Sequence, residues 1–373
     1  MRNLAVIFGG ESCEHDISII TALQALEAAD KEKYKIFPVY IRNGEWYSGR
    51  LNSIEAYKNF GKAKKFKIWL KKNTLYKTGL FKLPKKIAAI DFALLAVHGG
   101  NGENGALQGL LEMHDVPYTS ADVFASAVCM DKDKLRRFLR GLGYHIVKGN
   151  TVQRKEFEAN KSRCISNIVR KMSFPVIIKP ARLGSSIGIG IAANRAQLAA
   201  ALEAAFCYDD KAVIEVYLED KIELNCAAVK GANGNIYVSA IEKPLSKSQI
   251  LSFADKYQGG AKSEFKRELP ANITPELATE VRELTSKLYE ELELFGIVRI
   301  DFLYDNKEGK LYVNEINTVP GSLSFYLFEE CGIGFTRLID IMIDASVARK
   351  ADREKNITTY ISNVLNGKFD ISK

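Results

Sequence analysis

Two predicted strands near the C-terminus carry residues whose types and spacing suit chemistry. In IVRIDF, Arg299 and Asp301 are two residues apart and share one face of a strand, as do Glu315 and Asn317 in YVNEIN. If the strands are neighbours, two carboxylates, an amide oxygen and a guanidinium meet. Hard oxygen ligands of this kind select Mg²⁺ or Mn²⁺, above all where phosphate oxygens complete the coordination. Solvated surface charges are the alternative, and the apolar residues that flank these positions argue against it.

A glycine- and serine-rich loop, KPARLGSSIGIG at 179–190, lies between two predicted strands. Glycines let backbone N–H groups converge on an anion, and Lys179 at the strand end adds a point charge, which suits nucleotide phosphates. A plain hairpin with a glycine turn is the alternative. The loop also matches the GxSxG nucleophile elbow, but all four histidines precede it, whereas that fold needs its histidine after the serine. The sequence has no GxxxxGK[ST] phosphate loop.

Two further polar loops follow predicted strands in the N-terminal third: GGESCEH at 9–15 and HGGNGENG at 98–105. Ligands of open α/β sheets bind at such strand ends, where loops lead into helix N-termini. Glu14 could hold an ammonium group there, and His98 could lie beside a carboxylate. Either residue also suits a helix cap or a turn.

Strands and helices alternate over residues 1–125, which predicts an open parallel α/β sheet with these loops at one edge. Residues 126–215 predict a small central α+β unit that includes the glycine- and serine-rich loop. Its expected helices include KDKLRRFLRGLG, which Asp131 can cap, and one from Arg195 to Phe206. Residues 216–373 begin with a hairpin that turns at Gly-Ala-Asn-Gly (231–234) and continue with a helix from Pro275 to Leu294 and the two polar strands. The sequence therefore predicts an α/β protein of three domains.

Composition excludes several classes of protein. A chain of 373 residues with 47% hydrophobic and 26% charged residues is ordinary for a globular protein of roughly two to three domains. Its apolar runs are too short to cross a membrane, and its start does not resemble a signal peptide. Six widely spaced cysteines indicate reduced cytosolic thiols.

The net charge of +8 is local, because ten lysines and no acids lie within residues 62–86. They alternate with apolar residues, as on the solvated faces of short strands. This pattern argues against a nucleic-acid partner, and a docking patch for an anionic surface is the alternative.

The motifs FGGESCEHDIS, HGGNGENGALQGLLE, KPARLGSSIGI, DKY, RIDF and NEINTVPG, in this order, resemble the D-alanine–D-alanine ligase family of ATP-grasp enzymes over about residues 3–345. The resemblance implies a three-domain ATP-grasp fold in which the central domain clamps a nucleotide and the C-terminal sheet is antiparallel. It implies that ATP and two Mg²⁺ or Mn²⁺ ions are used to join two D-alanines through an acyl phosphate for peptidoglycan synthesis. It also implies a cytoplasmic homodimer without membrane insertion.

The resemblance further implies roles for single residues in substrate binding. Glu14 would hold the ammonium of the first D-alanine, and His98 would lie near its carboxylate. Tyr257 would join Ser185 and Glu14 in a hydrogen-bonded chain. The nucleotide-binding residues implied in the same way are Lys132, Lys179 and Lys256 for the phosphates, Glu215, Val216 and Leu218 for the adenine side, and Glu223 for the ribose.

For catalysis, the resemblance implies that Asp301, Glu315 and Asn317 bind the metal ions. Arg299 and the backbone N–H of Gly321 would then stabilise the oxyanion that forms during amide-bond formation.

The sequence departs from the family pattern where the second substrate would bind. Tyr326 stands where a serine is expected to hold the acceptor carboxylate, so that Tyr326 or the backbone near Leu327 would take this role. A related ligase with D-lactate, D-serine or another amino acid as second substrate is the alternative, and the Lys256-Tyr257 pair favours an amine acceptor. A non-catalytic nucleotide-binding protein is a further alternative, against which the intact polar strands argue.

Overall fold

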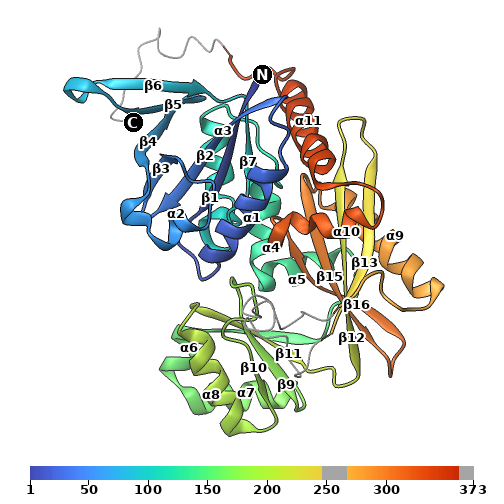
Figure 1. Ribbon diagram of the computed structural model, residues 1–373. Coiled ribbons are helices and arrows are strands. Elements are labelled where there is room, and N and C mark those ends of the chain that lie inside the picture. The colour runs from blue at the N-terminus through green and yellow to red at the C-terminus, as the bar shows by residue number, and fades with distance from the viewer. Residues whose placement is uncertain (246–266, 361–373) are drawn as a thin grey trace.

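The computed structural model describes residues 1–245 and 267–360, which form three β-sheets with helices packed against them (Figure 1). The first sheet lies at the upper left of Figure 1, the second at the bottom, and the third on the right between them. The sequence prediction of an α/β protein built on separate sheets is confirmed.

The first sheet has the strand order β6-β5-β4-β3-β2-β1-β7. Its strands are β1 (Arg2–Gly9), β2 (Tyr34–Arg42), β3 (Glu45–Gly49), β4 (Lys65–Lys71), β5 (Thr74–Thr78), β6 (Pro84–Ala89) and β7 (Phe92–Leu95). Strands β2, β1 and β7 pair in parallel, as predicted. The lysine-rich segment supplies β4, β5 and the first half of β6, which pair antiparallel, so this sheet is mixed.

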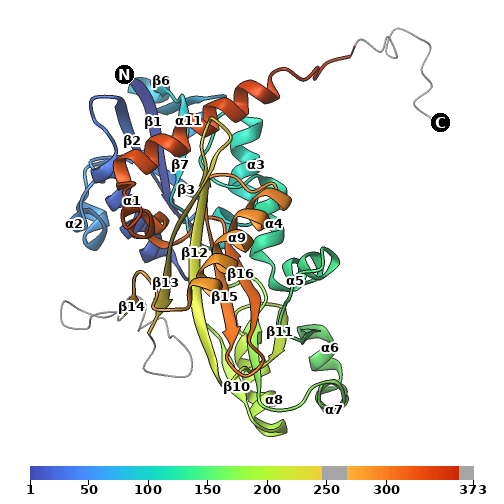
Figure 2. The ribbon, with the colours of Figure 1, turned by 90° about the vertical axis from the view of Figure 1, so that its right-hand side faces the viewer.

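Helices cover both faces of the first sheet because β1 is apolar on both sides. Leu4, Val6 and Phe8 join a core with α1 (His15–Ala28) and α11 (Phe335–Arg353). Ala5 and Ile7 point the other way, into a core with α3 (Ala106–Met113). Figure 2 shows α11, from the end of the described chain, lying along this sheet. The short helix α2 (Glu55–Lys58) precedes β4.

The second sheet, β10-β9-β11-β8, is antiparallel throughout. Its elements are β8 (Gly149–Gln153), α6 (Arg154–Ala159), α7 (Lys161–Lys171), β9 (Val176–Pro180), β10 (Gly190–Ala192), α8 (Arg195–Phe206) and β11 (Lys211–Val216). The three helices share one core with the sheet. The sequence prediction of a helix from Arg195 to Phe206 is confirmed, and Asn194 caps its first turn by accepting a hydrogen bond from the Gln197 N–H at 3.0 Å.

The third sheet, β14-β13-β12-β15-β16, is also antiparallel. Its strands are β12 (Lys221–Lys230), β13 (Ile236–Pro244), β14 (Arg267–Glu268), β15 (Ile297–Asp305) and β16 (Lys310–Asn317). One face packs against α4 (Val123–Met130), α5 (Lys132–Gly141) and α9 (Pro275–Glu291). On β12, Cys226 and Ala228 join this core, whereas Ala227 and Val229 join the α1–α11 core, so one strand ties two sheets together. A short helix, α10 (Phe325–Glu329), follows β16.

The three sheets fall one in each of the predicted units 1–125, 126–215 and 216–373, apart from the last residue of β11. The helices do not follow the same division. Helices α4 and α5 pack on the third sheet, and α11 packs on the first. The domain division itself stays a prediction.

No helix of the described residues is both long enough and apolar enough to cross a membrane.

Burial along β4 and β6 predicts that substitutions at buried and exposed positions affect stability unequally. Ile68→Ala should lower the free energy of unfolding by about 2–5 kcal/mol, because Ile68 is buried in the core with α3. Lys71→Gln and Lys85→Gln, at exposed positions, should change it by less than about 0.5 kcal/mol. Denaturant unfolding of the three variants measures this. A loss from a lysine substitution as large as that from Ile68→Ala would contradict the solvated-face interpretation.

Candidate active site

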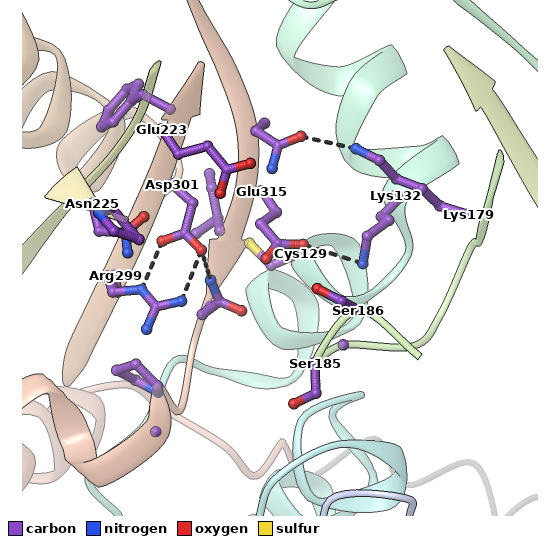
Figure 3. A pocket seen from close by; sticks show the side chains of 18 of the residues that line it. Cys129, Lys132, Lys179, Ser185, Ser186, Glu223, Asn225, Arg299, Asp301 and Glu315 are labelled. Atoms are coloured by element: carbon purple, nitrogen blue, oxygen red, sulfur yellow. Dashed lines mark hydrogen bonds and ion pairs between the residues drawn. The ribbon is translucent and has the colours of Figure 1, made fainter. Parts of the chain in front are cut away.

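A cavity of about 430 Å³ lies where the three sheets meet. Residues that sequence reasoning singled out line it from all three sides, and Figure 3 shows several of them. They are Glu14, His98, Lys132, Lys179, Ser185, Glu215, Val216, Leu218, Glu223, Arg299, Asp301, Glu315, Asn317, Gly321 and Tyr326. Lys256 and Tyr257 lie outside the described residues.

The predicted meeting of four polar side chains on two strands is confirmed. Asp301 faces Glu315, and Arg299 faces Asn317, in the register of β15 and β16. The Arg299 guanidinium donates to both oxygens of Asp301, from Nε at 2.6 Å and from Nη2 at 2.7 Å (Figure 3). The Asn317 Nδ2 donates to Asp301 Oδ2 at 3.1 Å. Burial opposes the charge of Arg299, but Asp301 raises the pKa of its guanidinium far above the usual value.

These residues suit a hard divalent cation. Asp301 and Glu315 supply carboxylate oxygens, and Asn317, which turns its Nδ2 towards Asp301, supplies an amide oxygen. Lys132 Nζ forms an ion pair with Glu315 Oε2 at 3.3 Å. Within residues 1–245 and 267–360, no group of three or more His, Cys, Asp or Glu side chains is placed to hold a metal, so the candidate set is two carboxylates and one amide.

Lys179, on β9 of the second sheet, and Lys132, on α5, both reach the cavity. On β9, Val176 and Ile178 enter the core, whereas Ile177 and Lys179 face the cavity. Lys179 Nζ donates to Asn314 Oδ1 at 3.0 Å and pairs with Glu215 at 2.7 Å.

Glu215 is buried on β11 and also pairs with Arg136. Burial alone would raise the pKa of Glu215, but Lys179 and Arg136 together lower it. Its carboxylate is thus bound by the two cations, so only the backbone of Glu215 would be available for the predicted adenine-side role.

The glycine- and serine-rich loop brings the second sheet against the first. Ser185 Oγ donates a hydrogen bond to Glu14 Oε1, although the two residues are 171 positions apart. Glycines make room for this contact. A Cβ on Gly184 would lie 3.0 Å from both Glu14 oxygens, and one on Gly99 would lie 2.7 Å from Glu14 Oε2. Ser185 and Ser186 have left-handed φ angles of 52° and 58°, a strained backbone of the kind that clusters at functional sites.

His98 and Glu103 hold the loop after β16. His98 Nδ1 donates to the Val319 carbonyl at 2.8 Å, and the Thr21 hydroxyl lies 2.7 Å from His98 Nε2. Burial lowers the pKa of His98 to about 4, so the ring is neutral and Nε2 accepts from Thr21. Thr21 in turn accepts from the Ser322 N–H at 3.0 Å. Both ring nitrogens are therefore engaged, and the predicted contact of His98 with a substrate carboxylate would have to replace one of these bonds.

Glu103 binds the other backbone group of Val319. It accepts from the Val319 N–H at 3.1 Å and from the Gly99 N–H at 2.6 Å. Burial, with a further contribution from the charge of Glu14, raises the pKa of Glu103 to about 8. Sequence reasoning noted the loop that contains Glu103 but gave this residue no role.

The chain turns sharply between Gly321 and Tyr326. Ser322, Leu323 and Ser324 are consecutive left-handed residues, with φ of 51°, 49° and 47°. Each costs of the order of 1–2 kcal/mol in an L-residue, and the turn brings both Gly321 and Tyr326 to the cavity. Leu327 does not line the cavity; its side chain is fully buried in the core with α1 and α11. Only its backbone could serve the predicted role.

Sequence reasoning gave no individual role to several further polar residues that line the cavity, among them Glu103, Lys221, Asn225, Glu242 and Arg267. Strict alternation along the hairpin of β12 and β13 was an available signal for Asn225 and Glu242, because each is followed or preceded by a core residue. For the other three, only the folded arrangement reveals the position.

Three sheets surround one cavity, with the glycine- and serine-rich loop on one side and the carboxylates of Asp301 and Glu315 on the other. This arrangement is that of an ATP-grasp enzyme. Family models described as D-ala D-ala ligase N-terminus and C-terminus match residues 3–121 and 138–344. A D-alanine–D-alanine ligase of Thermosipho melanesiensis is 37% identical over 373 residues, 98% of each chain. One of Caldicellulosiruptor bescii is 34% identical over 377 residues, covering 96% of this chain and 98% of the relative.

Solved structures of other ligases have a similar fold. The VanG D-Ala:D-Ser ligase of Enterococcus faecalis matches with a TM-score of 0.78 and 27% identity, covering 92% of this chain and 99% of that one. A D-alanine–D-alanine ligase of Coxiella burnetii, at 24% identity, supports the fold, with a TM-score of 0.78 over 95% of this chain and 98% of that one. The chain belongs to the D-alanine–D-alanine ligase family and is an ATP-dependent ligase.

The raised pKa of Glu103 predicts a pH-dependent effect of Glu103→Gln. Because the pKa in the folded protein lies above the ordinary value of 4.5, folding favours the protonated acid, and this contribution is lost as pH rises through about 8. A glutamine stays neutral and can still accept from Val319. The melting temperature of the variant relative to wild type should therefore rise by at least about 3 °C between pH 5 and pH 9.

Glu11→Gln, at an exposed position nearby, is the matched control and should show no such trend. A difference between Glu103→Gln and wild type that stays constant with pH would contradict the buried, protonated Glu103.

Proposed function

We propose that this protein joins two D-alanines into D-alanyl-D-alanine, converts ATP to ADP and phosphate, and supplies peptidoglycan precursor synthesis. The observation that carries the proposal is the contact between Glu14 and Ser185. It sets an acid suited to an ammonium group against a loop suited to phosphate, beside the Arg299–Asp301 pair and Glu315. A reaction between an amino-acid carboxylate and a terminal phosphate needs these three parts together.

In the first step, Glu14 holds the ammonium of the first D-alanine, and a carboxylate oxygen of that substrate attacks the γ-phosphorus of ATP. Lys132 and Lys179 stabilise the charge on the phosphate oxygens as the bond to ADP breaks, which leaves an acyl phosphate. Asp301, Glu315 and Asn317 would hold Mg²⁺ or Mn²⁺, two ions in our prediction, and the metal would supply further neutralisation of phosphate charge.

In the second step, the neutral amine of the second D-alanine attacks the acyl carbon, and phosphate leaves. Arg299 and the Gly321 N–H stabilise the tetrahedral oxyanion, a contribution of about 3–4 kcal/mol for one donor. Arg299 suits this role because its bidentate contact with Asp301 fixes the plane of the guanidinium.

The remaining assignments belong to the same proposal. Val216, Leu218 and Glu223 line the cavity on the side where the adenine and ribose would bind. Lys256 and Tyr257 are assigned the roles that the resemblance implies. We likewise propose that the protein is cytoplasmic and forms a homodimer.

The second substrate has one specific alternative. A solved relative with 27% identity is named a D-Ala:D-Ser ligase, so D-serine is a candidate acceptor beside D-alanine. The test measures phosphate release from ATP and Mg²⁺ with D-alanine, D-serine, D-lactate and L-alanine, alone and in pairs, and identifies products by mass spectrometry. We expect D-alanine alone to exceed D-lactate or L-alanine by at least about tenfold. Faster formation of a mixed D-alanyl-D-serine product would replace the proposal with the alternative.

Glu315→Gln should leave the fold intact and lower turnover by at least about a hundredfold, because a charged oxygen ligand is lost where phosphate charge must be neutralised. Steady-state phosphate release over a series of Mg²⁺ concentrations measures this. Glu308→Gln, exposed at the turn between β15 and β16, is the matched control and should keep the wild-type rate. A wild-type rate for Glu315→Gln at saturating Mg²⁺ would remove Glu315 from the metal site.

A further inference from the structure

The turn between β5 and β6, residues 79–83, exposes apolar side chains at the edge of the first sheet. Phe81 is 93% exposed and Leu83 is 64% exposed. Strand β6 is an edge strand, and Figure 1 shows this turn at the outer end of the sheet, away from the second and third sheets. Apolar side chains that gather at one exposed point, unlike singly scattered ones, mark interaction surfaces.

The backbone of the turn does not itself favour a phenylalanine. The Gly79 N–H donates to the Leu83 carbonyl at 2.7 Å and closes the turn. Phe81 and Lys82 have left-handed φ angles of 56° and 59°. Glycine or asparagine suits such a conformation better than a bulky side chain. The exposed Phe81 therefore stabilises neither the core nor the turn.

The surface around the turn is positively charged and largely unpaired. Residues 62–86 contain ten lysines and no acid. Among the residues that the structure describes, Lys67 alone of these ten forms an ion pair, with Glu45 at 3.1 Å. Lysines without a nearby carboxylate produce a positive potential that attracts an anionic partner. Those that are exposed in or next to the turn are Lys82, Lys85 and Lys86.

Protection of the sheet edge accounts for only part of this pattern. Lysine and proline on an edge strand hinder pairing with another chain, and β6 begins with Pro84, Lys85 and Lys86. Exposed apolar side chains have the opposite effect, because they favour association. Edge protection thus explains the charges on β6 but not Phe81 and Leu83.

A membrane surface with anionic lipids matches both parts of the pattern. Aromatic and leucine side chains enter the boundary between headgroups and acyl chains, while lysines stay at the level of the lipid phosphates. A nucleic acid offers phosphates but no apolar phase for a leucine side chain. A second copy of this chain that met the turn about a two-fold axis would bring the same unpaired lysines against each other.

The strand directions keep this surface away from the cavity. Strand β4 runs parallel to β1, and β5 runs antiparallel to both. The end of β5 therefore points away from the carboxyl end of β1, which leads to Glu14. Three strands, β4, β3 and β2, separate β5 from β1. A partner bound at the turn leaves the cavity open to its substrates.

We propose that the turn of residues 79–83 and the lysines around it bind the surface of a membrane that contains anionic phospholipids. Phe81 and Leu83 enter the headgroup boundary, and the lysines contact lipid phosphates. The attachment is peripheral and needs no membrane-spanning segment. It does not rest on the proposed function, because none of residues 62–86 lines the cavity.

The test measures cosedimentation of the full chain with vesicles of phosphatidylcholine, alone or mixed with phosphatidylglycerol. Binding to the mixed vesicles should be at least about a hundredfold tighter and should weaken as the salt concentration rises. A variant with Lys82→Gln, Lys85→Gln and Lys86→Gln should bind them about a hundredfold more weakly, because each lysine near an anionic surface contributes about a fivefold factor. A variant with Phe81→Ser and Leu83→Ser should lose about tenfold or more at unchanged charge.

Matched controls carry the same kinds of change elsewhere on the surface. One variant replaces three exposed lysines near or on the second sheet, with Lys148→Gln, Lys155→Gln and Lys171→Gln. The other replaces two exposed apolar side chains on α3 and α4, with Met113→Ser and Phe124→Ser. Both should bind mixed vesicles as the wild-type chain does, and thermal unfolding of every variant checks that it is folded.

Insertion of the turn has its own spectroscopic readout. Phe81→Trp should add fluorescence, relative to wild type, that brominated phosphatidylglycerol quenches in mixed vesicles. Met113→Trp, at a position that is 90% exposed, should add fluorescence that stays unquenched.

Several results would overturn the proposal. These are equal binding to both kinds of vesicle, wild-type binding by either turn variant, an equal loss in the matched controls, and an unquenched Phe81→Trp. Binding to duplex RNA or DNA but not to mixed vesicles would assign the lysines to a nucleic acid instead. A dimer that dissociates in the Phe81→Ser and Leu83→Ser variant, with no vesicle binding by wild type, would assign the turn to a second copy of the chain.

Discussion

The pairing of buried charges in one cavity is the constraint on which the rest of this structure depends. A charged side chain that leaves water must find a partner of opposite charge or several hydrogen bonds. Here Asp301 is paired with Arg299, and Glu215 with Lys179 and Arg136. The Arg299–Asp301 pair lies within β15, whereas Glu215 joins the second sheet to α5. Lys179 Nζ also donates to Asn314 on β16 at 3.0 Å, and Lys132 on α5 pairs with Glu315 at 3.3 Å, so polar contacts tie the second sheet and α5 to the third sheet.

Because side chains alternate between the two faces of a strand, the packing of the core also positions the residues of the site. On β9 and β15, alternate residues enter a core while their neighbours, Lys179, Arg299 and Asp301, face the cavity. A slip of one residue in the pairing of either strand would move polar groups into the core and apolar groups into the site. The same apolar contacts that stabilise the sheets therefore fix the positions of the reactive groups.

Long-range contacts of the first sheet complete the site. His98 and Glu103 bind both backbone groups of Val319, and Glu14 meets Ser185. Strained backbone at the serines of the two loops is held in place by these contacts. The amino-acid side of the cavity is in this way tied to the phosphate side and to the Gly321 turn, which suits a reaction whose acyl phosphate must be kept from water.

The sequence by itself determined the features that depend on near neighbours: the two polar strands, the glycine- and serine-rich loop, the helix from Arg195 to Phe206, and the capping of α5 by Asp131. Periodicity and capping act over a few residues, so a single sequence reports them. Only the tertiary structure decided which side chains bind the backbone of Val319 and which residue accepts the hydrogen bond of the Tyr326 hydroxyl. Glu103 and Val319 are 216 residues apart, and Tyr326 and Glu242 are 84 apart. No local pattern encodes such contacts, because they form when whole sheets pack together.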